Sequence, residues 1–149
     1  MKHLLSLLFC TVAVPLFVLG YQSYLDLIPV DKVPYVCKTF GSAGTNDYHY
    51  YNITEVGHEF CGYFSFDRNI FGQDFSFSYS WSNICHMDTD GDGRSNGVEL
   101  GDANCTWTPC SETNTNCAKL TAVSHPGYYE EEETVNGVTE YVGDCLLVC

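Results

Sequence analysis

The sequence predicts a small, disulfide-rich α+β domain built from short strands and helical turns. The chain has 149 residues and nine cysteines, eight of which lie after residue 20, a density typical of a small domain held by disulfides. Asn136-Gly137 stands between β-branched residues, which favours a tight β-hairpin near the C-terminus. Residues 88–99 are acidic and glycine-rich in the pattern of a metal-binding loop.

Residues 1–20 have the composition of a secretory signal peptide. Lys2 gives a positive start, a largely apolar run follows, and Gly20 is small enough to precede a cleavage site. The run is short for a membrane span and no second apolar stretch follows it, so we expect no span after cleavage. The mature chain would be residues 21–149, one secreted domain in which residues 128–149 form an acidic C-terminal hairpin.

The cysteines and sequons agree with an extracellular location. An even number of cysteines in an exported chain indicates four disulfides, whereas a zinc site, the rival interpretation, lacks paired Cys-x-x-Cys spacing. Asn52 and Asn104 are candidate glycosylation sites, although the second abuts a cysteine in a predicted bridge. The mature cysteines are Cys37, Cys61, Cys85, Cys105, Cys110, Cys117, Cys145 and Cys149.

The charge of the mature chain limits its partners. Without Lys2, five Lys and Arg stand against nineteen Asp and Glu, so the formal net charge is −14. Nucleic acids and anionic membranes would repel such a chain. The balance suits cations or basic partners.

The first half of the mature chain reads as short, separate elements. Pro29 and Pro34 allow one helical turn around residues 24–28 and then an extended arm. We expect a loop at residues 41–47 and two short strands within residues 49–66.

The middle of the chain predicts a strand and then two helical turns. Aromatic residues alternate with serines over Phe75–Ser82, which predicts a half-buried strand whose aromatic face covers the core. Trp81 and Ile84 are spaced for a short helix that leads into residue 88. Asn96 is expected to cap a second helical turn, which ends at Gly101.

The C-terminal part predicts irregular structure and a hairpin. Residues 106–122 read as a stapled loop and residues 124–127 as a turn. The run Glu130–Glu133 should lie partly on a hairpin strand, solvated on one face, and a second cation site there is disfavoured because charge runs are usually wet surface.

Residues 88–99 match the loop of an EF-hand, with oxygen ligands at positions 1, 3 and 5, glycine at 6 and glutamate at 12. Ca²⁺ takes six to eight oxygens at roughly 2.3–2.6 Å, and a curled segment can supply them. An acidic turn is the alternative, which the glutamate at the correct offset disfavours. A single unpaired extracellular loop should bind weakly, with Kd on the order of 10⁻⁴ to 10⁻³ M. The expected ligands are the side chains of Asp88, Asp90, Asp92, Asn96 (through a water) and Glu99 (through both oxygens), and the backbone carbonyl of Arg94.

Separated motifs of the mature chain resemble the temptin family, named for a molluscan water-borne pheromone protein. They run from residue 21 to residue 127, and the block around the acidic loop is the most specific. The motifs are Tyr21-x-x-Tyr24-Leu-x-x-Ile28-Pro29, Val33-Pro34-x-x-Cys37, Val56-Gly57-His58, Asn69-x-Phe71-Gly72-x-Asp74-Phe75, the block from Trp81 to Trp107, and Ser124-His125-Pro126-Gly127.

The resemblance implies a secreted protein that acts in a pheromone complex with other secreted proteins or peptides and has no catalytic role. It also implies that Cys85 pairs with Cys105, which would clamp the ends of the acidic loop. Cys37 should pair with a C-terminal cysteine, Cys145 or Cys149, and we take Cys149 as the candidate. The extra cysteines and the acidic hairpin depart from the family pattern.

Two other classes of function compete with a calcium-binding signalling or interaction module. The acidic balance also suits a structural protein of an extracellular or mineralising matrix, but long Asp or Glu repeats are absent. A metal-dependent enzyme would need His49, His58, His86 or His125 as ligands, yet no two have metal-binding spacing and no nucleophile motif accompanies them. The sequence therefore predicts no enzyme.

Overall fold

The computed structural model describes residues 25–41, 44–54, 56–59 and 68–145. The predicted signal peptide, Cys61 and Cys149 lie outside these ranges. Among the described residues, no helix is long and apolar enough to cross a lipid bilayer. The fold is a small disulfide-rich domain with one four-stranded mixed sheet and a few short helices, which confirms the predicted class at this level.

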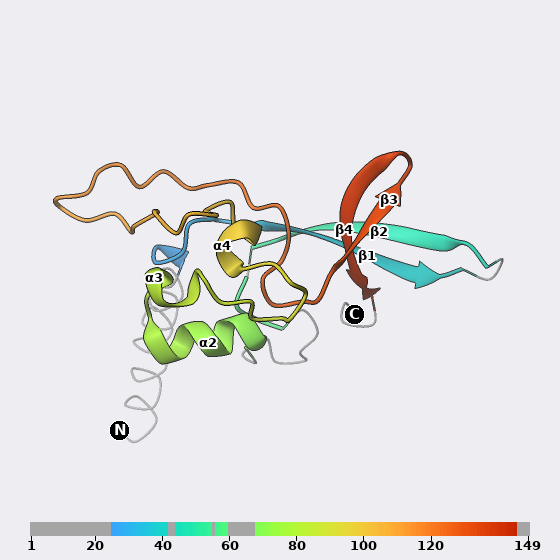
Figure 1. The fold of residues 1–149 in the computed structure, drawn as a ribbon, viewed down its shortest axis with the longest axis horizontal. Coiled ribbons are helices and arrows are strands. Elements are labelled where there is room, and N and C mark those ends of the chain that lie inside the picture. The colour runs from blue at the N-terminus through green and yellow to red at the C-terminus, as the bar shows by residue number, and fades with distance from the viewer. Residues whose placement is uncertain (1–24, 42–43, 55, 60–67, 146–149) are drawn as a thin grey trace, which may run out of the picture.

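Two antiparallel hairpins join side by side to make the sheet, in the order β2-β1-β4-β3. The inner strands β1 and β4 run parallel to each other, although they come from opposite ends of the described chain. The helices gather at one end of the molecule and the sheet extends toward the other (Figure 1). The strands are β1 (Val33–Phe40), β2 (Asn46–Ile53), β3 (Glu131–Val135) and β4 (Val138–Asp144).

A disulfide between Cys37 and Cys145 holds the parallel pair together, with a Cα–Cα distance of 4.9 Å. The expectation that Cys149 would be the partner of Cys37 was wrong, because Cys37 faces Gly143 in the strand register and Cys145 follows two residues later. The bridge spans 108 residues of sequence. In the chain-entropy model such a closure stabilises by about 4–5 kcal/mol.

The segment predicted as a strand, Phe75–Ser82, is helical. Helix α2 (Ile70–Ser78) begins at Asn69, whose side-chain oxygen accepts the Gly72 N–H at 2.8 Å, and this cap starts the helix upstream of the alternating segment. Tyr79, at φ 48°, then ends α2, and α3 (Trp81–Ile84) follows as predicted.

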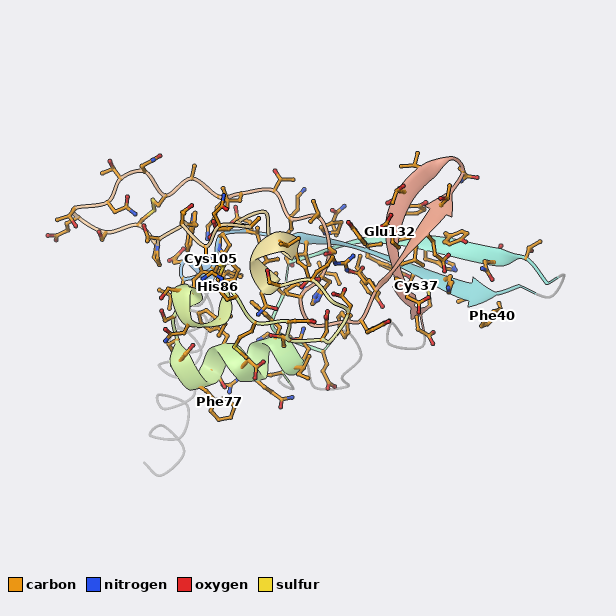
Figure 2. The ribbon with its side chains drawn as sticks, in the orientation of Figure 1. Cys37, Phe40, Phe77, His86, Cys105 and Glu132 are labelled. Atoms are coloured by element: carbon orange, nitrogen blue, oxygen red, sulfur yellow. A yellow bond between two sulfur atoms is a disulfide. The ribbon has the colours of Figure 1, made fainter. Side chains whose placement is uncertain are left out.

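The helical period sorts the aromatic residues differently from a strand. Phe71 and Phe75 lie one turn apart and are both fully buried, whereas Phe77 is 88% exposed and Tyr79 is 61% exposed. Figure 2 shows Phe77 pointing away from the body of the molecule. The alternating stripe is therefore split between core and solvent.

The main core lies between the N-terminal turn, β1 and the helices. Its largest fully buried side chains include Trp81, Tyr35, Phe71 and Phe75. A smaller apolar cluster of Val36, Val135 and Val142 lies across the strands. The sheet therefore contributes to both clusters.

The expectation of a loop at residues 41–47 and two short strands within residues 49–66 was wrong in part, because β2 begins at Asn46 and pairs with β1, and the described residues of 49–66 contain no second strand. The hairpin turn, the N-terminal turn and the irregular segment agree with their predictions. Asn136 (φ 52°) and Gly137 (φ 84°) are both left-handed, as a two-residue hairpin turn requires. Leu25 is helical and accepts the Ile28 N–H at 3.4 Å, so the expected N-terminal turn is present over its described part. Residues 106–122 contain no helix or strand.

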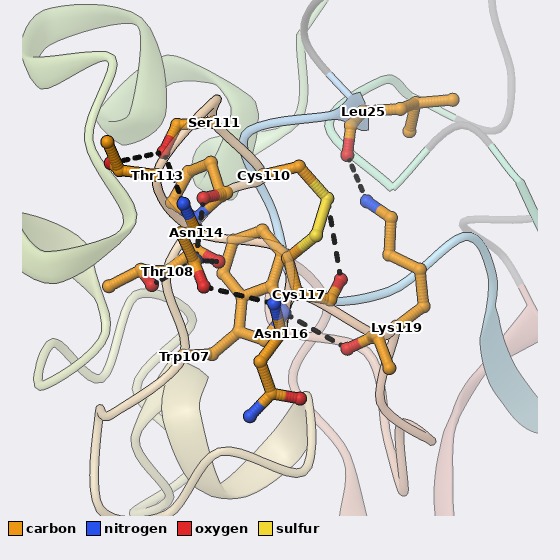
Figure 3. Close-up of a disulfide and its surroundings, with 12 residues drawn as sticks. Leu25, Trp107, Thr108, Cys110, Ser111, Thr113, Asn114, Asn116, Cys117 and Lys119 are labelled. Carbon is orange, nitrogen blue, oxygen red and sulfur yellow. Dashed lines mark hydrogen bonds between the residues drawn. A yellow bond between two sulfur atoms is a disulfide. The ribbon is translucent and has the colours of Figure 1, made fainter.

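Side-chain hydrogen bonds and a disulfide between Cys110 and Cys117 hold the irregular segment (Figure 3). Asn114 Nδ2 donates to Thr108 Oγ1 at 2.8 Å. Lys119 Nζ donates to the Leu25 carbonyl at 2.6 Å and so ties the segment to the N-terminal turn. The segment is ordered by side chains because it has no backbone ladder of its own.

Candidate metal centre

Residues 88–95 form a curled loop between α3 and α4, and α4 (Asn96–Glu99) supplies the last four positions of the predicted metal-binding segment. Gly91 (φ 81°) and Gly93 (φ 94°) supply left-handed backbone that residues with side chains rarely adopt. Their N–H groups donate to the two oxygens of Asp88, at 2.9 and 3.0 Å. The loop therefore folds back on its first aspartate.

The next two aspartates hold the loop in the same way. The Asp92 N–H donates to Asp90 Oδ1 at 3.3 Å, and the Arg94 N–H donates to Asp92 Oδ1 at 2.9 Å. Each carboxylate thus accepts an N–H from two residues further along, and these local turns aim the acidic side chains inward.

Three of the predicted ligands meet in the folded loop. Asp88, Asp90 and Asp92 each bring one carboxylate oxygen to within 4.8 Å of the others. Among the residues that the structure describes, this is the group of three or more His, Cys, Asp or Glu side chains that could hold a metal ion. Asp90 Oδ2 is buried and has no hydrogen-bond partner there.

Burial and the neighbouring Asp92 raise the pKa of Asp90 to about 6. Both effects disfavour its charged form, since the carboxylate loses water and faces another negative charge. A bound cation would reverse that balance.

Glu99 lies deeper than the aspartates. Its side chain is fully buried, Oε1 accepts the Ser124 hydroxyl at 3.0 Å, and Oε2 has no partner within the described ranges. Burial, together with the negative charges of Asp90 and Asp92, raises its pKa to about 9. An unpartnered buried carboxylate oxygen is costly unless a cation or proton satisfies it.

Asn96 has a different role from the predicted helix cap. Ser95 caps α4 by accepting the Val98 N–H, while Asn96 Nδ2 donates to the Ile84 carbonyl and to Thr89 Oγ1, both at 2.8 Å. Asn96 Oδ1 is buried without a hydrogen-bond partner among the described residues. The side chain therefore ties the two ends of the loop together and leaves one oxygen available.

The Arg94 side chain is part of the site, which the sequence pattern did not indicate. Its guanidinium forms an ion pair with Asp92, and Nη2 lies 3.7 Å from Glu99 Oε1 and 3.7 Å from Glu130 Oε2. It also stacks over the Tyr141 ring, 3.7 Å from the centroid. The predicted role of Arg94 was limited to its backbone carbonyl.

Glu130 also joins the site, and the expectation of a solvated run was wrong at this position. It is 3% exposed, and its Oε2 accepts the His125 N–H at 2.9 Å. Its pKa is raised to about 8, chiefly by burial; the His125 N–H and Arg94 oppose the rise, and Asp90 and Asp92 add to it. Position 130 is far from residues 88–99 in sequence, so only the tertiary fold reveals the contact.

The disulfide between Cys85 and Cys105 brackets the loop, as the resemblance implied. Gly97 packs against it: a Cβ at this position would lie 2.5 Å from Cys85 Sγ and 2.7 Å from the Asp102 carbonyl oxygen. Figure 2 shows Cys105 beside His86, whose Nδ1 lies 3.3 Å from Cys105 Sγ. The disulfide therefore holds the acidic loop at both of its ends.

The four histidines considered as metal ligands do not lie together. His49 contacts Thr39 on the β1–β2 hairpin, at 3.3 Å, and His86 lies beside the disulfide. His125 is fully buried, and burial lowers its pKa to about 3. Its Nδ1 accepts the Gly127 N–H at 3.0 Å, as expected of a turn residue. His58 makes an isolated β-bridge to Arg68.

Asn52 and Asn104 are both exposed, and their glycosylation remains a prediction.

Fold and site together define a small disulfide-stapled domain with acidic side chains converging in one loop. The family model described as Temptin C-terminal matches residues 18–128, well over half of the chain, and the chain therefore belongs to the temptin family. It is 50% identical over 70 residues to Temptin of Aplysia californica, a match that covers 46% of this chain and 51% of that protein. The match thus spans about half of that relative. No solved structure matches the chain.

Proposed function

We propose that this protein is a secreted, calcium-binding, non-enzymatic signalling or interaction module related to temptin. The observation that supports the proposal is the set of buried, unpartnered oxygens on Asp90, Asn96 and Glu99. All three are expected ligands, and all three belong to one loop. When bound, Ca²⁺ would supply the positive charge that hard oxygen ligands favour.

The chain's own residues prepare the site for the ion. Backbone N–H groups hold the aspartates, and Ser124 orients Glu99. Because folding and the neighbouring disulfide already order these groups, cation binding needs little further ordering. The expected ligand set is unchanged: Asp88, Asp90, Asp92, Asn96, Glu99 and the Arg94 carbonyl.

Membership of the temptin family supports secretion and a part in a pheromone complex with other secreted proteins. The matrix alternative is less well supported. Of the four glutamates in the run at residues 130–133, Glu130 is buried and Glu133 is paired with Lys38, which leaves two facing solvent. A mineral surface would need a longer array of free carboxylates.

One experiment with two parts tests the proposal. Calorimetric titration of the oxidised, secreted protein with calcium should give saturable heat with Kd on the order of 10⁻⁴ to 10⁻³ M. Affinity capture from the native secretion should retain a partner in calcium and release it in chelator. An absence of heat up to several millimolar calcium would refute the calcium site, and capture that ignores chelator would refute the coupling of calcium to partner binding.

A further inference from the structure

The Arg94 guanidinium joins two segments that are distant in sequence. It faces carboxylates from the loop, Asp92 and Glu99, and one from the start of the C-terminal hairpin, Glu130. Its side chain is 15% exposed, so these contacts are largely shielded from water. Ion pairs that are exposed to solvent contribute little to stability, whereas ion pairs that are excluded from water interact more strongly and depend on their exact position.

The C-terminal hairpin supplies two of the groups around this guanidinium. Glu130 directly precedes β3, and Tyr141 lies in β4 with its ring under the guanidinium, 3.7 Å from centroid to Cζ. A cation over an aromatic face is attracted to the ring. The hairpin therefore contacts the metal loop through Arg94.

The ion-pair network around Arg94 does not satisfy all of its own polar atoms. Glu130 Oε1 and Arg94 Nε are both buried and have no hydrogen-bond partner in the described part of the chain. Three carboxylates, from Asp92, Glu99 and Glu130, lie within ion-pair distance of the one guanidinium, and buried charges are costly when they are unequal in number. Asp88 and Asp90 add further negative charge because their carboxylates converge with that of Asp92 in the same loop.

We propose that Glu130 is a positioning residue of the cation site, which holds Arg94 against the hairpin while a cation takes Asp92 and Glu99. This inference rests on the proposed calcium site. Without Glu130, the guanidinium would keep its ion pairs with Asp92 and Glu99 and would compete with the cation for them. Cation affinity and hairpin docking are coupled through this one side chain.

Glu130→Gln tests the inference because Gln keeps an acceptor for the His125 N–H and removes the charge. Calcium affinity, measured by calorimetry, should fall about tenfold. The matched control is Glu132→Gln, an exposed position of the same run on β3, which should change the affinity less than twofold (Figure 2). Urea unfolding in chelator should show Glu130→Gln to be folded and at least as stable as the wild type.

Arg94→Met separates a positioning role from direct ligation. By removing the competing charge, Arg94→Met should tighten calcium binding several-fold, and adding Glu130→Gln to it should then change the affinity threefold or less. Equal affinities of Glu130→Gln and Glu132→Gln would overturn the inference while leaving the calcium site intact. A tenfold loss that persists in the Arg94→Met background would overturn the route through Arg94. If the wild type binds no calcium, the proposed function itself fails.

Discussion

Replacing Asp90 by asparagine should stabilise the calcium-free protein and reduce the further stabilisation that calcium provides. In the calcium-free protein, Asp90 carries a buried, unpartnered oxygen near Asp92, and its pKa is raised to about 6. Asparagine removes the charge and the repulsion at nearly the same volume. In the calcium-bound protein the same change replaces a negatively charged ligand by a neutral one, which should weaken calcium binding.

The size of each effect follows from the structure. The shift from 3.8 to about 6 means that ionising Asp90 at pH 7.5 costs roughly 3 kcal/mol in the fold at face value. Because the side chain is partly exposed, solvent screening reduces this to about 1–2 kcal/mol, which the variant should recover in chelator. Calcium at tenfold Kd stabilises the wild type by about 1.4 kcal/mol, and the variant should lose most of that gain.

Urea unfolding at pH 7.5 with the disulfides intact measures both effects. In chelator the Asp90→Asn midpoint should lie above that of the wild type, and addition of calcium should move it less than it moves the wild type. Asp47→Asn, an exposed position on β2, is the matched control and should follow the wild type under both conditions. A loss of stability in chelator as large as that in calcium would refute the reasoning, because Asp90 would then be a structural residue.

Two further predictions concern the frame around the site. Asp102 is 5% exposed and accepts the Trp81 indole N–H at 2.7 Å and the Trp107 backbone N–H at 3.0 Å. Asp102→Asn should therefore lower the free energy of unfolding, measured in urea, by about 3 kcal/mol. A decrease below about 1 kcal/mol would contradict this role. His125 is buried with its pKa lowered to about 3, so the unfolded chain binds the extra proton between pH 6.5 and 3. The contribution of His125 to stability should therefore fall as pH drops through that window, by about 2 kcal/mol at pH 5. His125→Asn should flatten that pH profile relative to an exposed control, His86→Asn, and parallel profiles would show that His125 does not carry the dependence.

The parts of the molecule that could be predicted from sequence are those encoded locally. The Asn136-Gly137 turn needs two left-handed residues, and Asn and Gly are the residues that adopt them. The acidic loop is likewise encoded by twelve consecutive residues, whose aspartates bond to their own backbone.

The aromatic segment was mispredicted because its decisive signals lie outside the alternating window. Asn69 caps α2 six residues before Phe75, and Gly72 allows the helix to pack closely on another part of the chain. A Cβ at Gly72 would lie 1.9 Å from the Gly57 carbonyl oxygen. Periodicity within Phe75–Ser82 contains neither contact, so it favoured a strand.

Arg94 and Glu130 show a second limit of prediction from sequence, which concerns contacts between residues that are distant along the chain. In the loop pattern Arg94 is an unremarkable position 7, and in the hairpin Glu130 is the first of four glutamates. Runs of charged residues are usually solvated. That expectation was wrong for Glu130, the one glutamate of the run that is buried against the turn at His125. Such contacts are set by tertiary packing, so spacing along the sequence does not reveal them.

The way in which the two ends of the chain meet bears on how the site works. The disulfide between Cys37 and Cys145 fixes β4 against β1, and β4 carries Tyr141 to the Arg94 guanidinium. The groups around the candidate cation therefore come together only when the sheet is complete, because Glu130 and Tyr141 belong to the hairpin and Asp92 to the loop. Since a ligand that binds the folded state stabilises the whole fold, a cation here would stabilise the sheet as well as its own loop. Calcium binding would then stabilise a surface that includes the hairpin, and a partner that binds this surface would respond to calcium without contacting the ion.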